Sequence, residues 1–246
     1  GFGLLAVVFI AGSITHGAKL SITVYGITLQ PSELVKVLFV FFVAGMLHEA
    51  VDFKRIVLTS ALAAAHVLLL VVSKDLGAAL IFFVTYLVML YVASRQPLYF
   101  LGGLLAGSAA AWVAWKLFAH VQTRVLAWSD PFSVIDKEGY QIAQSLFAIG
   151  TGGWFGLGIN QGMPYKIPVV EQDFIFSAIA EEMGILFALL LIFIYLSSFY
   201  MILNIAIVLK DSYYKLVAVG LGTLMIFQVF LSIGGVTKFI PSTGVT

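Results

Sequence analysis

Residues 76–94 read LGAALIFFVTYLVMLYVAS, an uninterrupted uncharged run between Asp75 and Arg95. A helix needs roughly 20 such residues to cross the hydrocarbon core of a bilayer, so this run predicts a membrane span. The whole chain shares this character: 61% of its 246 residues are apolar and 10% are charged. Soluble domains carry about 25% charged residues. The sequence therefore predicts an all-α fold, a polytopic transmembrane helix bundle.

Further charge-poor intervals extend this pattern along the chain. They are residues 1–14, 34–47, 56–73, 97–119, 176–206 and 216–237. With the run above, they predict about seven spans or part-spans, all in a single integral membrane domain over residues 1–246. The chain starts inside an apolar run and stops just after a turn-like segment, so we expect it to be a piece of a longer protein.

Residues 120–175 are rich in glycine, which opposes a continuous helix. We expect one large loop there, with a short amphipathic helix near residues 141–149. The loops at 48–55, 95–98 and 207–215 are short and carry five lysines and arginines. The positive-inside rule places these loops in the cytoplasm. The large loop is then extracytoplasmic.

Composition also argues against several kinds of site. There is no strongly basic patch, so we expect no nucleic-acid partner. There is no cysteine, which excludes disulfides and thiolate metal sites. The four histidines lack paired ligand spacing, so no metal-binding residue is assigned.

A cluster of four acids is the most informative chemical feature. Glu171 and Asp173 precede the predicted span at 176–206, and Glu181 and Glu182 lie inside it. Carboxylates at the end of a membrane span or inside it cost free energy, so their presence favours a role as general base, proton relay or cation site. On a helix, Asp173 and Glu181 would lie roughly on one face.

Other polar segments have both a structural and a functional interpretation. The segment Gln30, Pro31, Ser32, Glu33 and Lys36 fits a capped, ion-paired helix start or a site for an anionic head group. Lys74 and Asp75 fit a neutralised tight turn or, for Asp75, a group facing a central cavity. Arg124 and Lys166, among the aromatic residues of the large loop, fit solvated cations or ligands for a lipid phosphate.

In this order, these segments resemble the RodA/FtsW family, the SEDS (shape, elongation, division and sporulation) membrane proteins. The matching pieces are Gln30-Pro31-Ser32-Glu33 with Lys36, Asp75-Leu76-Gly77, Gly139-Tyr140-Gln141-Ile142, Gln144-Ser145, Gly152-Gly153, Asp173-Phe174-Ile175-Phe176, Glu181-Glu182-Met183-Gly184 and Pro241-Ser242-Thr243-Gly244. The resemblance implies about ten spans in the full protein. Two departures stand out: Lys19 lies where the family has a Trp-Arg pair, and Val169 follows Pro168 where the family has Glu, leaving Glu171 as the nearest acid.

The resemblance implies a peptidoglycan glycosyltransferase that polymerises lipid II at the outer face of the cytoplasmic membrane. Asp173 would be the catalytic residue, taking a proton from the acceptor hydroxyl. The candidate substrate-binding residues are Lys19, Gln30, Ser32, Glu33, Lys36, Lys74, Asp75, Arg124, Lys166, Glu171 and Glu181. The cations among them would face the lipid diphosphate, and the expected cofactor, if one is used, is a divalent cation, Mg²⁺ or Mn²⁺. Expected partners are lipid II, membrane lipids and a class B penicillin-binding transpeptidase.

Two alternatives remain at this point. In a lipid-precursor flippase or transporter, Asp75, Glu181 and Glu182 would form a proton or cation path. In a weakly catalytic scaffold, the chain would mainly recruit the transpeptidase.

Overall fold

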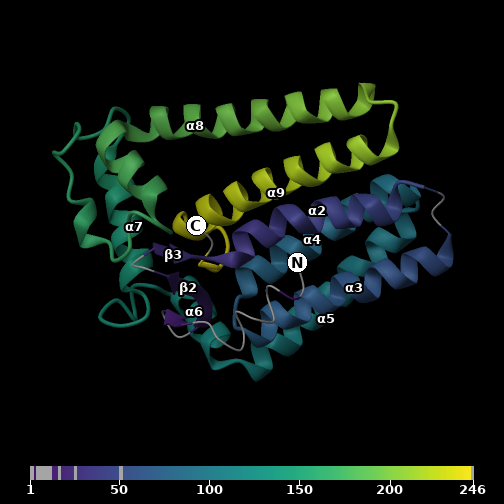
Figure 1. The fold of residues 1–246 in the computed structure, drawn as a ribbon. Helices are drawn as coiled ribbons and strands as arrows, with labels where there is room; N and C mark the ends of the chain where they lie inside the picture. Colours follow the sequence, from purple (N-terminus) through teal and green to yellow (C-terminus); the bar gives the residue numbers. More distant parts are fainter. Residues whose placement is uncertain (1–2, 4–12, 16–17, 25–26, 50–51, 245–246) are drawn as a thin grey trace. The chain divides into compact units, whose positions relative to one another are not determined.

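The computed structural model describes residues 3, 13–15, 18–24, 27–49 and 52–244 (Figure 1). Helices dominate this part of the chain, which confirms the predicted helix bundle. The long helices are α2 (Pro31–Leu47), α3 (Phe53–Val72), α4 (Leu76–Ser94), α5 (Pro97–Leu117), α8 (Ile175–Val208) and α9 (Ser212–Val236). All of these except α2 are long and apolar enough to cross a membrane. The predicted span end at residues 1–14 lies largely outside the described residues.

Two of these helices differ from their predicted intervals. α2 begins at Pro31, ahead of the short interval 34–47, because proline suits the first turn of a helix. This extends α2 to 17 residues. α8 is interrupted near its start: Gly184 has φ 83° and ψ 169°, so a short helical segment precedes the break and the apolar span follows it.

The segments expected as loops contain regular structure. The predicted loop 120–175 contains most of α6 (Ala119–Ser129), together with α7 (Tyr140–Gly152) and the 3₁₀ turn η1 (Pro164–Lys166). α7 confirms the short helix expected near residues 141–149. Ahead of α2, the strands β1 (Ser13–Thr15), β2 (Ala18–Val24) and β3 (Ile27–Leu29) form an antiparallel sheet in the order β1-β2-β3. These strands are not predicted from the sequence, because segments this short show little periodicity.

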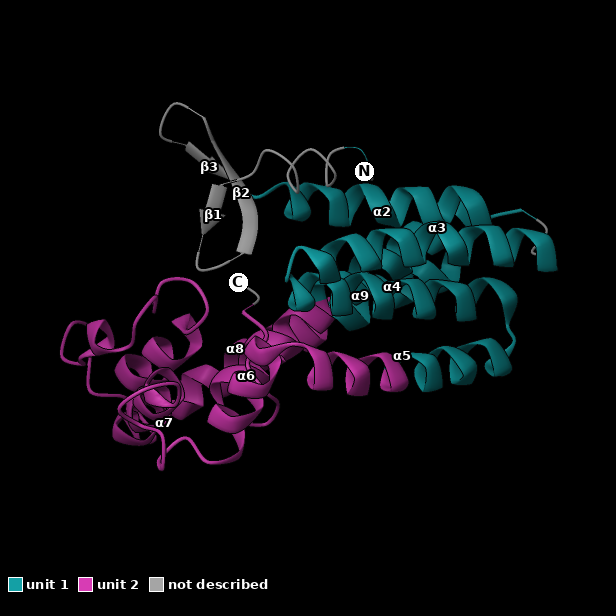
Figure 2. Cartoon of the chain, turned by 90° about the horizontal axis from the view of Figure 1, so that it is seen from below, with its two compact units in different colours: residues 1–107, 199–225 teal, residues 108–198, 226–246 magenta. Residues whose placement is uncertain are grey.

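The chain forms two compact units, coloured separately in Figure 2. Unit 1 comprises residues 1–107 and 199–225, and unit 2 comprises residues 108–198 and 226–246. The boundaries fall inside α5, α8 and α9. The single membrane domain expected from the sequence stays a prediction.

The core of unit 1 is made by closely packed apolar helices. The rings of Phe39 on α2 and Phe82 on α4 have centroids 4.8 Å apart, and both side chains are buried. On α9, a Cβ added to Gly220 would lie 2.5 Å from Val40 and 2.8 Å from Met89. The glycine therefore allows α9 to approach α2 and α4 closely.

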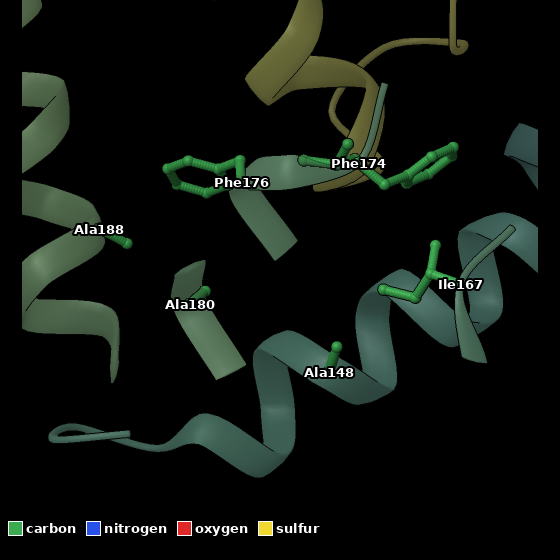
Figure 3. Packing of buried hydrophobic residues seen from close by; sticks show 7 residues of the cluster. Ala148, Ile167, Phe174, Phe176, Ala180 and Ala188 are labelled. Atoms are coloured by element: carbon green, nitrogen blue, oxygen red, sulfur yellow. The ribbon is translucent and has the colours of Figure 1, made fainter. Parts of the chain in front are cut away.

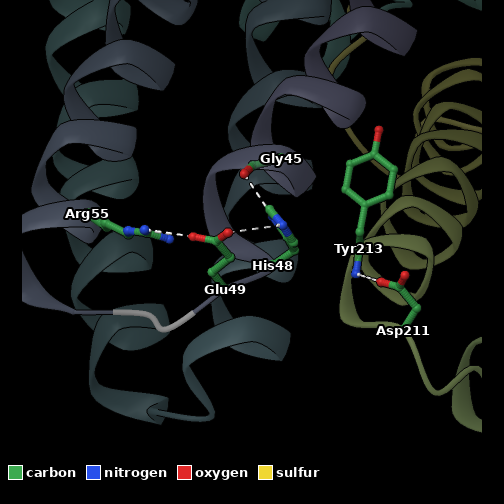
Figure 4. Close-up of polar contacts among 6 residues, drawn as sticks. All are labelled: Gly45, His48, Glu49, Arg55, Asp211 and Tyr213. Atoms are coloured by element: carbon green, nitrogen blue, oxygen red, sulfur yellow. Dashed lines mark hydrogen bonds and ion pairs between the residues drawn. The ribbon is translucent and has the colours of Figure 1, made fainter.

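Polar contacts stabilise two connections of unit 1, the one between α2 and α3 and the one between α8 and α9 (Figure 4). The guanidinium of Arg55 pairs with the carboxylate of Glu49 at 2.8 Å. His48 donates from Nδ1 to the carbonyl of Gly45 at 2.9 Å. Between α8 and α9, a carboxylate oxygen of Asp211 accepts the backbone N–H of Tyr213 at 2.8 Å.

The pair of Glu49 and Arg55 makes stability depend on pH. The hydrogen bond from Arg55 and its charge hold the pKa of the Glu49 carboxyl below its usual value of 4.5. A lowered folded-state pKa adds stability above the unfolded value, and this stability is lost as pH falls through the folded pKa. We expect Arg55→Met to remove this acid-sensitive increment, measured as melting temperature against pH between about 3 and 6. Lys54→Met, on the same connection, should leave the profile unchanged.

Candidate active site

The start of α8 in unit 2 is anchored by a buried apolar cluster. Phe174 and Phe176 are 3% and 6% exposed, whereas Ile175 between them is 50% exposed. Figure 3 shows the two rings with the other labelled members of the cluster, which are Ala148, Ile167, Ala180 and Ala188. Asp173, directly before this anchor, is half-buried. The packing on both sides of Ile175 therefore fixes the backbone from which the Asp173 carboxylate projects.

Asp173 lines a pocket of about 220 Å³ that lies wholly within unit 2. Its walls come from α6, α7 and the turn before it, the turn before α8, the end of α9 and the segment 242–244. The polar residues lining it are Thr123, Arg124, Gln141, Glu138, Asp173, Ser232, Ser242 and Thr243. The volume suits part of a polar substrate, such as a sugar ring or a phosphate, but not a whole lipid-linked molecule.

A cation and a carboxylate meet at the edge of this pocket. Arg124 donates from Nη1 to the carbonyl of Thr243 at 2.8 Å. A Cβ placed on Gly244 would lie 3.2 Å from Nη2 of Arg124 and 3.8 Å from Oδ2 of Asp173. Both charged groups therefore border the same point, which glycine leaves open. Such a site offers a base for a hydroxyl and a forked cation for a phosphate.

The segment that follows α9 is bound to α6 at two places. Besides the bond from Arg124, the indole N–H of Trp128 donates to the carbonyl of Lys238 at 3.1 Å. These bonds hold the segment whose residues 242–244 form one wall of the pocket.

A buried serine pair joins three helices beside the pocket. Ser145 on α7 donates to the carbonyl of Val236 on α9 at 2.8 Å. Its hydroxyl also lies 2.6 Å from that of Ser177 on α8. Since each hydroxyl has one hydrogen, Ser177 must donate to Ser145. Both side chains are fully buried, so this chain of bonds fixes the helices that position Asp173.

Three other predicted residues of unit 2 do not line this pocket. Glu181 is buried, and its Oε1 accepts the backbone N–H of Met163 at 3.2 Å. Lys166 lies in η1 and Glu171 in the turn before α8, and both are exposed. The structure thus brings Arg124 to Asp173 and turns Glu181 toward the loop that precedes η1.

The other predicted residues with described side chains lie in unit 1, at the start of α2 and in the turn before α4. Lys36 is 4% exposed and pairs with Glu33 at 2.7 Å, as the sequence predicts. Asp75 is 8% exposed and caps α4 by accepting the N–H of Ala78 at 3.0 Å, while Lys74 is exposed. Glu33, Lys36 and Asp75 therefore each have a structural contact as well as a charge.

Of the capped, ion-paired helix start that the sequence allows here, the structure shows the ion pair but no side-chain cap. Gln30 occupies the N-cap position and makes no side-chain capping bond. Ser32 lies inside the first turn and is 4% exposed, and its hydroxyl has no hydrogen-bond partner among the described residues. Lys19 lies in β2, where the structure describes the backbone but not the side chain.

The described residues hold no group of three or more His, Cys, Asp or Glu side chains that could bind a metal ion. The acids lining the Asp173 pocket are Asp173 and Glu138. Mg²⁺ and Mn²⁺ prefer several oxygen ligands. Mg²⁺ is commonly held by one or two carboxylates together with substrate phosphates, so the divalent cation expected from the sequence stays a prediction.

Sequence reasoning missed several pocket residues. Glu138, Ser232 and Thr123 carried no local signal, since each comes from a different segment and is ordinary in its own. Gln141, Ser242 and Thr243 lie within quoted motifs, so the motifs themselves could have marked them.

Comparisons with known proteins add independent information. A family model described as cell cycle protein (FTSW_RODA_SPOVE) matches residues 1–246. The chain is 36% identical to the peptidoglycan glycosyltransferase RodA of Mycobacterium tuberculosis (strain ATCC 25618 / H37Rv), over 99% of this chain and 57% of that protein. It is 31% identical to the stage V sporulation protein E of Bacillus subtilis (strain 168), over 100% of this chain and 69% of that protein. It thus spans little more than half the length of its mycobacterial relatives.

Solved structures share the fold. One chain, from a structure described as "Structural coordination of polymerization and crosslinking by a peptidoglycan synthase complex", matches with a TM-score of 0.83 and 26% identity, over 100% of this chain and 70% of that one. Rod shape determining protein RodA of Thermus thermophilus matches with a TM-score of 0.69 and 22% identity, over 100% of this chain and 66% of that one, which speaks to the fold alone.

Proposed function

The chain belongs to the FtsW/RodA/SpoVE family of cell cycle proteins, and on this premise we propose that it is the larger part of a peptidoglycan glycosyltransferase. The substrate would be lipid II and the product a glycan strand. Relatives from several bacteria are named peptidoglycan glycosyltransferases, which supports the activity. The observation that carries the proposal is the placement of Asp173 and Arg124 at one pocket.

In the proposed reaction, the Asp173 carboxylate takes the proton of the acceptor sugar hydroxyl. The freed oxygen attacks the anomeric carbon of the donor as the bond to the lipid diphosphate breaks. A single displacement of this kind inverts the anomeric configuration. The guanidinium of Arg124 would bind a donor phosphate, since its planar fork matches phosphate oxygens. The buried anchor of Phe174 and Phe176 would keep the base in place between turnovers.

The protein is a multi-pass membrane protein, and we propose that the pocket faces outward. Lys54 and Arg55 lie at the start of α3, next to the connection from α2. The short connections after α4 and α8 carry Arg95 and Lys210. A cytoplasmic position of these connections is what the positive-inside rule expects. A class B transpeptidase is the proposed partner, in keeping with the polymerising and crosslinking complex whose chain shares this fold.

The direct test uses the full-length protein with its transpeptidase and fluorescent lipid II. We expect a ladder of glycan chains on a gel. Movement of lipid II across vesicles without any polymer would instead favour a flippase. A stable transpeptidase complex that makes no polymer would favour a scaffold.

Arg124 gives a second test of the same site. We expect Arg124→Met to lower kcat/KM for lipid II about tenfold or more, since a hydrogen bond to a charged group contributes ~1.5–3 kcal/mol. Arg124→Lys should recover part of this loss, because it keeps the charge without the fork. Lys137→Met removes an exposed cation from the turn between α6 and α7, outside the pocket, and should act like the unmodified protein. Equal rates for the Met variants at positions 124 and 137 would remove Arg124 from the site.

A further inference from the structure

A glycine-rich loop of unit 2 exposes an unusual amount of apolar surface. Residues 153–165, which follow α7 and extend into η1, contain no charged residue. Six of their large side chains are between 47% and 83% exposed: Trp154, Phe155, Leu157, Ile159, Met163 and Tyr165. Exposed apolar surface gathered in one segment marks an interaction site.

This loop is held in place by many bonds, so its exposure does not come from looseness. The N–H groups of Leu157 and Gly158 donate to the carbonyls of Glu181 and Glu182, each at 2.9 Å. In return, the N–H of Ile185 donates to the carbonyl of Gly153 at 2.9 Å. The loop is thus bonded to both sides of the break in α8.

Two carboxylates also bind the loop: that of Glu181, which is buried, and that of Glu182, which is half-buried. Oε1 of Glu182 accepts the N–H of Asn160 at 3.1 Å, and Oε1 of Glu181 accepts that of Met163 at 3.2 Å. A carboxylate that accepts a backbone N–H makes a stronger bond than a neutral acceptor. These acids therefore stabilise the 153–165 loop in the position seen.

The position of these hydrogen bonds along α8 indicates which surface the 153–165 loop contacts. The apolar span of α8 begins directly after Gly184, and most of its large side chains are partly or fully exposed, Phe193 at 63% among them. The loop is bonded to the first residues of this span, Ile185 and Leu186. The loop is therefore bonded to the residues at which the α8 span would enter the bilayer.

We propose that residues 153–165 are an interfacial anchor whose apolar side chains insert into the lipid surface around the start of the α8 span. Trp and Tyr favour this zone because their rings are apolar with a polar edge. The absence of charge in the loop removes the main cost of insertion, and Lys166, just beyond it, can reach lipid phosphates. Because η1 and Asp173 follow the loop closely in sequence, the anchor would set the height of the Asp173 pocket above the bilayer.

The test measures the depth of the loop in vesicles of phosphatidylethanolamine and phosphatidylglycerol. A nitroxide is attached to Phe155→Cys in the full-length protein, with any cysteine outside residues 1–246 replaced. Collisions of the label with oxygen and with a water-soluble nickel chelate are compared by electron paramagnetic resonance. Phe193→Cys supplies the reference within the span, and Ser133→Cys, exposed in another loop of unit 2, supplies the aqueous reference.

We expect the label at position 155 to meet the nickel chelate at least about threefold less often than the label at 133, and to meet oxygen less often than the label at 193. Values equal to those at 133 would overturn the proposal. So would a label that is aqueous in vesicles and is shielded only when the transpeptidase is added, because the loop would then bind protein. Size-exclusion elution of each variant shows whether it is folded. The readout needs no turnover, so it stands apart from the test of the glycosyltransferase activity.

Discussion

Asp173→Asn is expected to lower the rate of glycan polymerisation by ~10²–10⁴-fold, the usual contribution of a positioned general base. Asparagine has nearly the same shape but cannot accept the proton of the attacking hydroxyl. The anchor of Phe174 and Phe176 remains, so folding and lipid II binding should persist. Initial rates of polymerisation, taken from glycan ladders resolved on a gel, give the fold loss of activity. Binding of labelled lipid II to the purified variant shows whether affinity is lost as well.

Asp136→Asn is the matched control for this variant. Asp136 is an exposed acid in unit 2 that does not line the pocket, so its loss should leave polymerisation unchanged. An Asp173→Asn protein that is folded and as active as the Asp136→Asn protein would refute the assignment of the base.

Gly184→Ala is expected to destabilise the protein by about 2–4 kcal/mol through backbone strain and overpacking. The φ of 83° and ψ of 169° at Gly184 lie in a region that only glycine adopts readily. A Cβ there would also collide with backbone atoms of Trp154, Phe155 and Gly156, which cannot move aside as a flexible side chain could. The measurement is the midpoint of thermal unfolding in detergent, which should fall by ~5–15 °C.

Gly150→Ala is the comparison that isolates this effect. Gly150 is exposed on α7, and a Cβ added to it would meet nothing within 4 Å. Because alanine favours a helix over glycine by ~0.5–1 kcal/mol, this variant should be as stable as the unmodified protein or more so. If both variants melt at the same temperature, the break in α8 does not need glycine.

The candidate site was predictable in part. Asp173 stands out in the sequence because an acid beside a long apolar run is costly, and this holds whatever the rest of the chain does. Arg124 was one of several cations with equal claims. Its place in the lining of the Asp173 pocket distinguishes it, and this place depends on the bond to the carbonyl of Thr243, 119 positions away in sequence.

Glu181 shows the opposite case. Its spacing from Asp173 suggests one helical face, and the residues between them are helical from Ile175 onward. Yet its Oε1 accepts the N–H of Met163, and it does not line the Asp173 pocket. Helical periodicity gives the direction of a side chain around its helix but not the segment that packs there.

The sequence by itself determined the class of fold, the helices and the position of the acid, because hydropathy and helix signals act over one or two turns. Only the tertiary structure decided the break at Gly184, the pocket that joins Asp173 to Arg124, and the fastening of the 153–165 loop by Glu181 and Glu182. Each of these features depends on backbone N–H or C=O groups that find no partner within their own segment and are hydrogen-bonded by a segment distant in sequence. Since every buried N–H and C=O needs a partner, the choice among partners is made only when the helices pack.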